Sequence, residues 1–123
     1  MSQVMNTPTQ HIDLSQFSGS ERLYRILPRL VITEGVQYLA DQTQCYWLVS
    51  AIYSHLVTVD VCSEFVVATL TVSEQRAALS LDDGNGRLIC HQHIEHTDFP
   101  LREITLYCCY HSSYWTLLLP TEY

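Results

Sequence analysis

Two histidines one residue apart are the side chains whose type and spacing come closest to a reactive site. His91 and His93 lie in the segment CHQHIEH, and imidazole is the commonest protein ligand for transition metals. At positions i and i+2 of a β-strand the two rings share one face and could bind the same ion. The sequence therefore offers His91 and His93 as candidate ligands of a zinc-like metal.

Such a site needs a third ligand, and the sequence does not place one beside the pair. Glu95 continues the same face, but three same-face residues on one strand span about 13 Å, too far for one ion. Cys109 and His111 are the nearest candidates from another strand. Because Cys90 and Ile94 belong to the core side of the same strand, we expect the histidines to point away from the core.

The segment DDGNG, residues 82–86, has the residue types of a calcium or phosphate loop but not the spacing. An EF-hand loop needs carboxylates at alternate positions and a distal glutamate. A phosphate loop opens a helix and usually contains lysine, whereas this loop precedes a strand. Glycine and asparagine tolerate the positive φ of tight hairpins, so the segment predicts a turn, with either Gly84-Asn85 or Asn85-Gly86 at its centre.

Nucleophilic chemistry has less support. Cys109 and His111 share a face and would be the pair of a thiol enzyme, but no basic side chain lies close to them to stabilise a thiolate. Neither G-x-S-x-G nor H-E-x-x-H occurs. The cysteines are odd in number, without C-x-x-C spacing, and predict buried free thiols. No catalytic residue is assigned, and no cofactor is expected.

Charge and hydropathy exclude further classes of function. The chain of 123 residues has a formal charge of −7, and its six cationic side chains are all arginines. A negative net charge repels phosphate backbones, so no nucleic-acid partner is expected. No run of about 18 to 20 apolar residues is present, so no membrane association is expected. Without a visible signal peptide, the chain is expected to be cytoplasmic.

The elements that would position these residues begin with helices. Residues 1–14 are polar and predict a flexible arm, followed by a single domain over residues 15–123. Ser18 and Glu21 form a candidate capping box for a helix that Pro28 ends or kinks. Thr33 is a candidate cap for a second helix, and the apolar spacing from Cys45 to Leu56 predicts another over roughly residues 45–56.

From Glu64 onward the apolar period changes from helical to two, which predicts about five short strands. A two-residue turn at Ser112-Ser113 would place Tyr110 opposite Trp115 and Cys108 opposite Leu117. The expected fold is α+β, with two or three N-terminal helices on one face of a roughly five-stranded antiparallel meander. The second face of that sheet would carry a group of apolar side chains, namely Phe65, Val67, Ile89, Tyr107, Tyr114 and Leu118.

Several segments together resemble a family of small bacterial proteins of unknown function. They are FSGSERLYR, ITEGVQYLAD, CYWLVSAI, DDGNG, HTDFPL and LLLPTEY, which span roughly residues 17–123. The resemblance implies a single-domain protein, often associated with mobile elements, without an assigned activity. No site residue can be carried over, and the histidines at 91, 93 and 96 depart from the family pattern.

Three hypotheses follow. The first is a non-enzymatic interaction domain that forms a homodimer, or binds a protein partner, through its apolar second sheet face or its terminal strand. The second is a metal-dependent enzyme built on His91 and His93, or a thiol enzyme built on Cys109. The third is an acidic mimic of nucleic acid, which would need carboxylates at phosphate-like intervals on one face.

Overall fold

A computed structural model describes residues 22–58 and 64–123 of the chain. The flexible arm and the capping box at Ser18 and Glu21 lie outside these residues. The described elements are β2 (Leu23–Leu27), β3 (Leu30–Thr33), α1 (Glu34–Thr43), α2 (Tyr46–Thr58), β4 (Phe65–Ser73), β5 (Arg76–Asp82), β6 (Leu88–Ile94), β7 (Glu103–His111), β8 (Tyr114–Leu118) and the 3-10 helix η1 (Pro120–Glu122).

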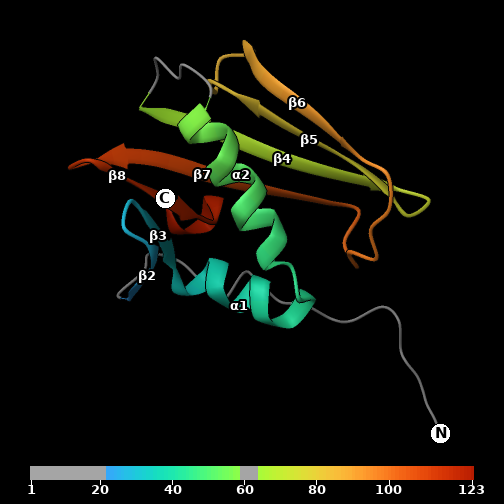
Figure 1. The fold of residues 1–123 in the computed structure, drawn as a ribbon, viewed down its shortest axis with the longest axis horizontal. Helices are drawn as coiled ribbons and strands as arrows, with labels where there is room; N and C mark the ends of the chain where they lie inside the picture. Colours follow the sequence, from blue (N-terminus) through green and yellow to red (C-terminus); the bar gives the residue numbers. More distant parts are fainter. Residues whose placement is uncertain (1–21, 59–63) are drawn as a thin grey trace, which may run out of the picture.

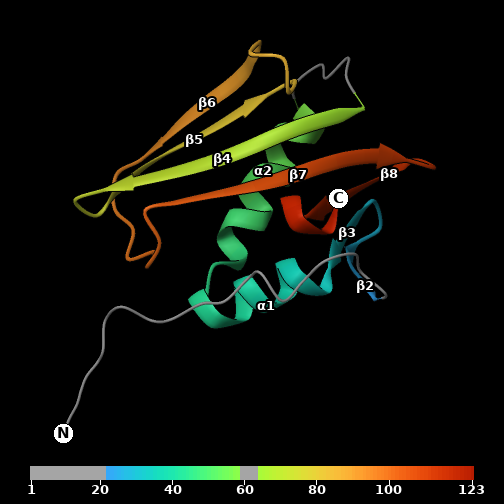
Figure 2. The same ribbon diagram turned by 180° about the vertical axis from the view of Figure 1, so that it is seen from behind.

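The described strands form one seven-stranded sheet in the order β2-β3-β8-β7-β4-β5-β6. All neighbouring pairs are antiparallel except β3 and β8, which run parallel. Both helices lie on the same side of the sheet, with α2 crossing β4 and β7 (Figure 1). Seen from behind, β4 and β7 lie in front of α2 (Figure 2). The core fills the space between the helices and the sheet.

The expected five-stranded antiparallel meander is wrong, because the sheet has seven described strands and is mixed. Strands β4, β5 and β6 follow one another as hairpins, but β7 then returns to pair with the other side of β4. The connection over residues 95–102 is held by main-chain bonds, from Thr97 N to Gln75 O and from Val72 N to Arg102 O. Periodicity reveals strands but not which distant strand each one joins.

The helix expected before Pro28 is wrong as well, because residues 23–33 form the hairpin of β2 and β3. Their apolar spacing fits a helix, but Pro28 and Arg29 make a tight turn that pairs Leu27 with Leu30. All four residues of β3 are buried, with β2 on one side and β8 on the other. Burial against a strand far along the chain outweighs local helix propensity here.

The two helices after Thr33 are confirmed. Thr33 has extended backbone, and its hydroxyl oxygen accepts from the Val36 amide as an N-cap, while Gln44 ends α1 in the left-handed region. Helix α2 covers the region predicted from the spacing of Cys45 to Leu56. Leu48, Ile52 and the other stripe residues are buried against the sheet.

The register predicted for the last hairpin is confirmed, since Tyr110 pairs with Trp115 and Cys108 with Leu117. Both turn residues, Ser112 and Ser113, have positive φ, as the two-residue hairpin requires. The terminal strand is not an exposed edge. Strand β8 lies between β3 and β7, so its main-chain groups on both edges face a neighbouring strand of the same chain.

Candidate functional site

The two histidines lie on the outer side of β6. His91 pairs with Ser80 and His93 with Ala78, and the ring centroids are 4.8 Å apart in an edge-to-face arrangement. Gln92, between them, points to the helix side and makes a 2.6 Å hydrogen bond with His55 of α2. Since neighbours on a strand alternate, both histidines face away from the core, as the alternation predicted.

The structure does not bring the candidate third ligands to this pair. Cys109 and His111 lie on β7, and strands β4 and β5 separate β7 from β6. Two intervening strands correspond to about 14 Å between the strand axes. Within residues 22–58 and 64–123, no group of three or more His, Cys, Asp or Glu side chains could hold a metal ion. Metal binding by His91 and His93 stays a prediction.

The described cysteines are not set up as nucleophiles. Burial raises the pKa of the Cys90 thiol and of the Cys109 thiol. The pKa of the fully buried Cys108 thiol is raised far more, first by burial and then by Cys109. A raised pKa keeps a thiol protonated and unreactive at neutral pH. The geometry therefore gives the thiol hypothesis no activated group in the described part of the chain.

The turn predicted for DDGNG joins β5 to β6 and is confirmed. The Asp83 carboxylate accepts from the backbone amides of Asn85 at 2.8 Å and Arg87 at 3.2 Å. These bonds, that of Asn85 first, lower the pKa of Asp83. Leu81 pairs with Cys90, as predicted with Asn85-Gly86 at the centre, but the register shifts at the next pair, Asp82 with Leu88, so the predicted two-residue centre is not formed. Gly84 has a φ of +84°, and a Cβ there would lie 3.1 Å from the Phe65 ring.

The side of the sheet opposite the helices is uncovered by any described helix (Figure 2). We call the outward side chains in the middle of β8, β7, β4 and β5, between the charged residues at the strand ends, the open face. Their strand neighbours, such as Val66, Leu70 and Leu106, are buried in the core. The open face consists of Phe65, Val67, Thr69, Thr71, Ala78, Ser80, Thr105, Tyr107, Cys109, Thr116 and Leu118.

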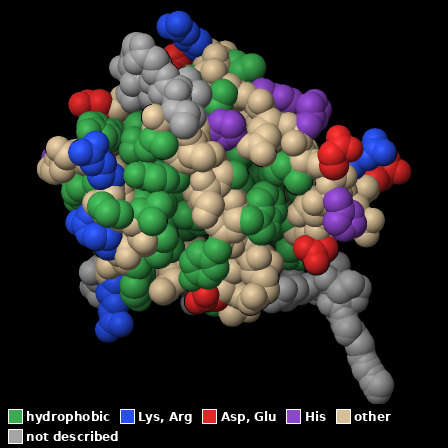
Figure 3. Space-filling model, viewed as in Figure 1, with side chains coloured by type: hydrophobic (Ala, Val, Ile, Leu, Met, Phe, Trp, Pro, Cys, Tyr) green, Lys and Arg blue, Asp and Glu red, His purple; other side chains and the backbone are tan. Residues whose placement is uncertain are grey.

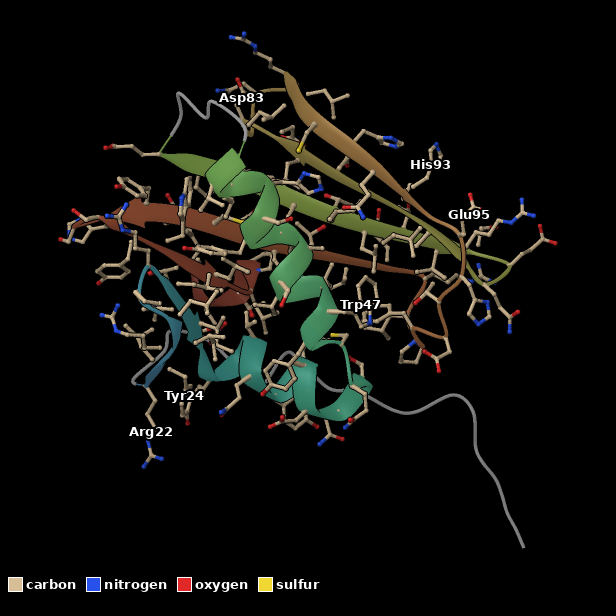
Figure 4. All side chains as sticks on the ribbon, in the orientation of Figure 1. Arg22, Tyr24, Trp47, Asp83, His93 and Glu95 are labelled. Carbon is tan, nitrogen blue, oxygen red and sulfur yellow. The ribbon has the colours of Figure 1, made fainter. Side chains whose placement is uncertain are left out.

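No member of the open face is charged. The charged side chains of these strands that share its side are at the strand ends, namely Arg76, Asp82 and Glu103. His93 and Glu95 lie at the β6 edge of the molecule, far from Tyr24 on β2 and from Arg22 just before it (Figure 4). A shallow groove of about 560 Å³ runs beside Ala78, between the β4–β5 turn and the end of β6.

An aromatic cluster occupies the other end of the open face. The ring of Phe65 lies 5.1 Å from that of Tyr107, and the ring of Tyr123 lies 5.4 Å from both. Sequence analysis placed Phe65 and Tyr107 on this side but assigned no role to Tyr123. Phe65 and Tyr107 follow from strand alternation, whereas Tyr123 lies after the last strand and has no periodic signal.

The role of Glu122 has no signal in the sequence pattern around it. Its side chain is 7% exposed and lies at the N-terminus of α1, where its carboxylate accepts from Thr33, Gly35 and Leu119. Two segments that carry the family resemblance, ITEGVQYLAD and LLLPTEY, therefore meet at this carboxylate. That both segments carry the resemblance was the one sequence signal for a shared role. Nothing in the sequence indicates that the two segments are in contact.

Hydrophobic side chains are also exposed on the side that carries α2 (Figure 3). Tyr46, Trp47 and Val57 of α2 are among the exposed large hydrophobic residues, and the Trp47 ring packs edge-on against Phe99. Among the described residues, no helix is long and apolar enough to cross a membrane.

Comparisons with known proteins add a family and a fold. The model of a family of unknown function, DUF6876, matches residues 9–123. Among solved structures, a protein of unknown function from Enterococcus faecalis has a TM-score of 0.54 at 14% sequence identity, and the match covers 77% of this chain and 90% of that one. At this identity the likeness shows the fold alone. No curated protein matches the chain.

Proposed function

For this chain, which belongs to the DUF6876 family of unknown function, we propose a non-enzymatic role as a self-association domain. Two copies pair through the open face. The observation that carries this proposal is the uncharged open face on four adjacent strands, with charged groups on its side of these strands only at their ends. Uncharged surfaces with exposed aromatic rings, rimmed by polar groups, are typical of protein interfaces.

Net charge selects the open face, rather than another part of the surface, as the place where two copies can meet. Each copy has a formal charge of −7, so two copies repel wherever their carboxylates approach. The open face is where contact adds no like-charge pair. A twofold axis through it places the same surface on both copies, as a closed symmetric dimer requires.

The alternatives have less support. The two histidines lack a third ligand among the described residues, and the partly buried thiols have raised pKa values. An acidic mimic would need a continuous row of carboxylates. On the side in Figure 3, the acidic side chains are separate groups around the rim, with uncharged surface between them.

Light scattering coupled to size-exclusion chromatography tests the proposal. The wild type is expected to have twice the mass of the 14.2 kDa chain. Thr69 pairs with Ser80 on one side and Thr105 on the other, in the middle of the open face. Thr69→Glu puts a charge into that middle, so it is expected to give a folded monomer.

The matched control is Val57→Glu, on the exposed surface of α2. It adds the same charge on the other side of the molecule and is expected to leave the dimer intact. A wild type that stays monomeric at every soluble concentration contradicts the proposal. A dimer that Val57→Glu separates and Thr69→Glu does not would place the interface on α2 instead.

A further inference from the structure

We propose that Glu122 is a positioning residue for the open face. Its carboxylate, anchored on the N-terminus of α1, holds Tyr123 against Phe65 and Tyr107, and these three rings are the main contact for the second copy. This inference rests on the proposed self-association. It adds which part of the open face makes the contact and which buried group keeps that part in place.

The anchor is a carboxylate with donors on both oxygens. Glu122 Oε1 accepts from the Thr33 hydroxyl at 2.6 Å and from the Leu119 amide at 2.9 Å, while Oε2 accepts from the Gly35 amide at 3.1 Å. The Gly35 amide belongs to the first turn of α1, where free N–H groups and the helix dipole favour an anion. With both oxygens bound and the side chain buried, Glu122 has one orientation.

The space for this anchor exists because residue 35 is glycine. A Cβ at position 35 would lie 2.6 Å from Glu122 Oε1 and 2.7 Å from Oε2, closer than real Cβ atoms approach other atoms. Gly35 does not have positive φ, so it is required for the close approach and not for its backbone freedom. The N-terminus of α1 is thus shaped around this one carboxylate.

Tyr123 follows the anchor directly, and its ring lies on the opposite side of the sheet from the core. It contacts the rings of Phe65 and Tyr107, each at 5.4 Å between centroids, yet 75% of the residue is exposed. A ring this exposed has few contacts of its own to fix it. Its position therefore depends on the backbone that Glu122 holds, since ordering a free side chain costs entropy.

An exposed aromatic ring in a fixed position is a good binding group, because little of its freedom is left to lose when a partner arrives. Tyrosine is enriched among the few interface residues that carry most of the binding energy. Gly84 lies against the ring of Phe65, since a Cβ there would be 3.1 Å from that ring. The three rings thus contact one another in the free chain, before a second copy arrives.

A double-mutant cycle on the dissociation constant of the dimer tests the inference. Tyr123→Ser is expected to weaken the dimer about tenfold, and Glu122→Gln by a similar factor. If Glu122 acts through Tyr123, then adding Glu122→Gln to Tyr123→Ser changes the dissociation constant no further. Thr121→Ala, an exposed change in the same segment, is the control and is expected to have no effect. The inference is overturned if the double variant weakens the dimer by the product of the two single fold-changes in dissociation constant.

Nuclear Overhauser contacts separate this inference from the proposed function. In the monomeric Thr69→Glu background, contacts between the rings of Tyr123 and Phe65 are expected with Glu122 present and lost in Glu122→Gln. Contacts that persist overturn the positioning role. Contacts that disappear, with a wild type that is always monomeric, uphold the positioning but overturn the self-association. Should Glu122→Gln not fold, Glu122→Asp keeps the charge, shortens the reach by one methylene, and is expected to lose the same contacts.

Discussion

At the scale of single residues, two opposing effects meet at Gly35. In a helix, replacing glycine by alanine is worth about 1 kcal/mol of added stability. At this position the added Cβ would lie 2.6 Å from Oε1 of Glu122, whose carboxylate accepts from Thr33 and Leu119 at that oxygen and from Gly35 at the other. Displacing that carboxylate costs buried hydrogen bonds at about 1 to 3 kcal/mol each. The contact therefore outweighs the helix propensity, and Gly35 is a packing residue.

Gly35→Ala is expected to lower the free energy of unfolding by about 2 kcal/mol, as measured by urea denaturation. In a Glu122→Ala background the obstacle is gone, so the same change becomes neutral or stabilising. Gly86→Ala is the control, since it meets nothing within 4 Å but has a φ of +91°, and only the backbone strain of about 1 kcal/mol remains. If Gly35→Ala lowers the free energy of unfolding equally with and without Glu122, the packing role of Gly35 is contradicted.

Asp83 makes the stability of the chain depend on pH in the acid range. Its pKa is lowered from 3.8 in the folded chain, first by the Asn85 amide and further by Arg87. A depressed folded-state pKa means that the stabilisation is complete above the unfolded value and is lost as the pH falls through the folded value. The difference in unfolding free energy between wild type and Asp83→Asn is therefore expected to be constant above about pH 5 and to shrink below about pH 4. A pH-independent difference would contradict this.

At the scale of elements, the β4–β5 hairpin has a turn whose residues do not suit it. Glu74 and Gln75 both have positive φ, at 53° and 66°, and Ser73 pairs directly with Arg76. Two-residue turns of this kind favour asparagine followed by glycine. The left-handed conformation costs a residue with a Cβ about 1 to 2 kcal/mol. A hydrogen bond from the Thr97 amide to the Gln75 carbonyl helps to offset this cost and stabilises the turn.

Replacing Glu74-Gln75 by Asn-Gly is expected to stabilise the chain by about 1 kcal/mol. The bond from Thr97 is to a main-chain carbonyl and is kept. The melting temperature should rise by about 4 °C for a domain of this size. Ser54→Gly, at an exposed position of α2, adds a glycine where the backbone is helical and should lower it. A lower melting temperature for both variants would mean that the side chains of Glu74 and Gln75 contribute more to stability than their positive φ values cost.

Local signals explain which elements the sequence could predict. The cap at Thr33 and the apolar stripe of α2 are complete within their own helices, and strand alternation is complete within each of β4 to β8. Alternation also placed His91 and His93 on the outer side. The β2–β3 hairpin could not be predicted, because the spacing of Leu23–Leu30 also fits a helix and only the distant β8 decides between them.

The residues of the candidate site also differ in whether a local sequence signal could assign them. Phe65 and Tyr107 could be assigned to the outer side, since their strand neighbours Val66 and Cys108 are evident core residues. Glu122 could not, because a charged residue near the end of an apolar strand resembles an exposed tail. Only the contact with the N-terminus of α1 gives it a buried role, and that contact joins residues 89 positions apart.

At the scale of the whole molecule, the charge of −7 and the uncharged open face together fix how association should respond to salt. When two copies meet through the open face, few charged groups come into contact, but the remaining carboxylates of both copies still repel across solvent. Salt screens this repulsion, since the Debye length falls from about 10 Å at 0.1 M to about 3 Å at 1 M. Apolar contacts are not weakened by such screening.

The dimer is therefore expected to tighten as sodium chloride rises from about 0.05 M to about 0.5 M, as measured by sedimentation equilibrium. The reason is specific to the open face, because an interface made of ion pairs between Arg22 or Arg25 and carboxylates would loosen over the same range. Arg76→Ser, which removes a cation at the end of β5 without touching the uncharged centre, should increase the repulsion and steepen the response. A dimer that weakens with added salt would exclude the open face as the main contact, since only charged contacts are lost by screening.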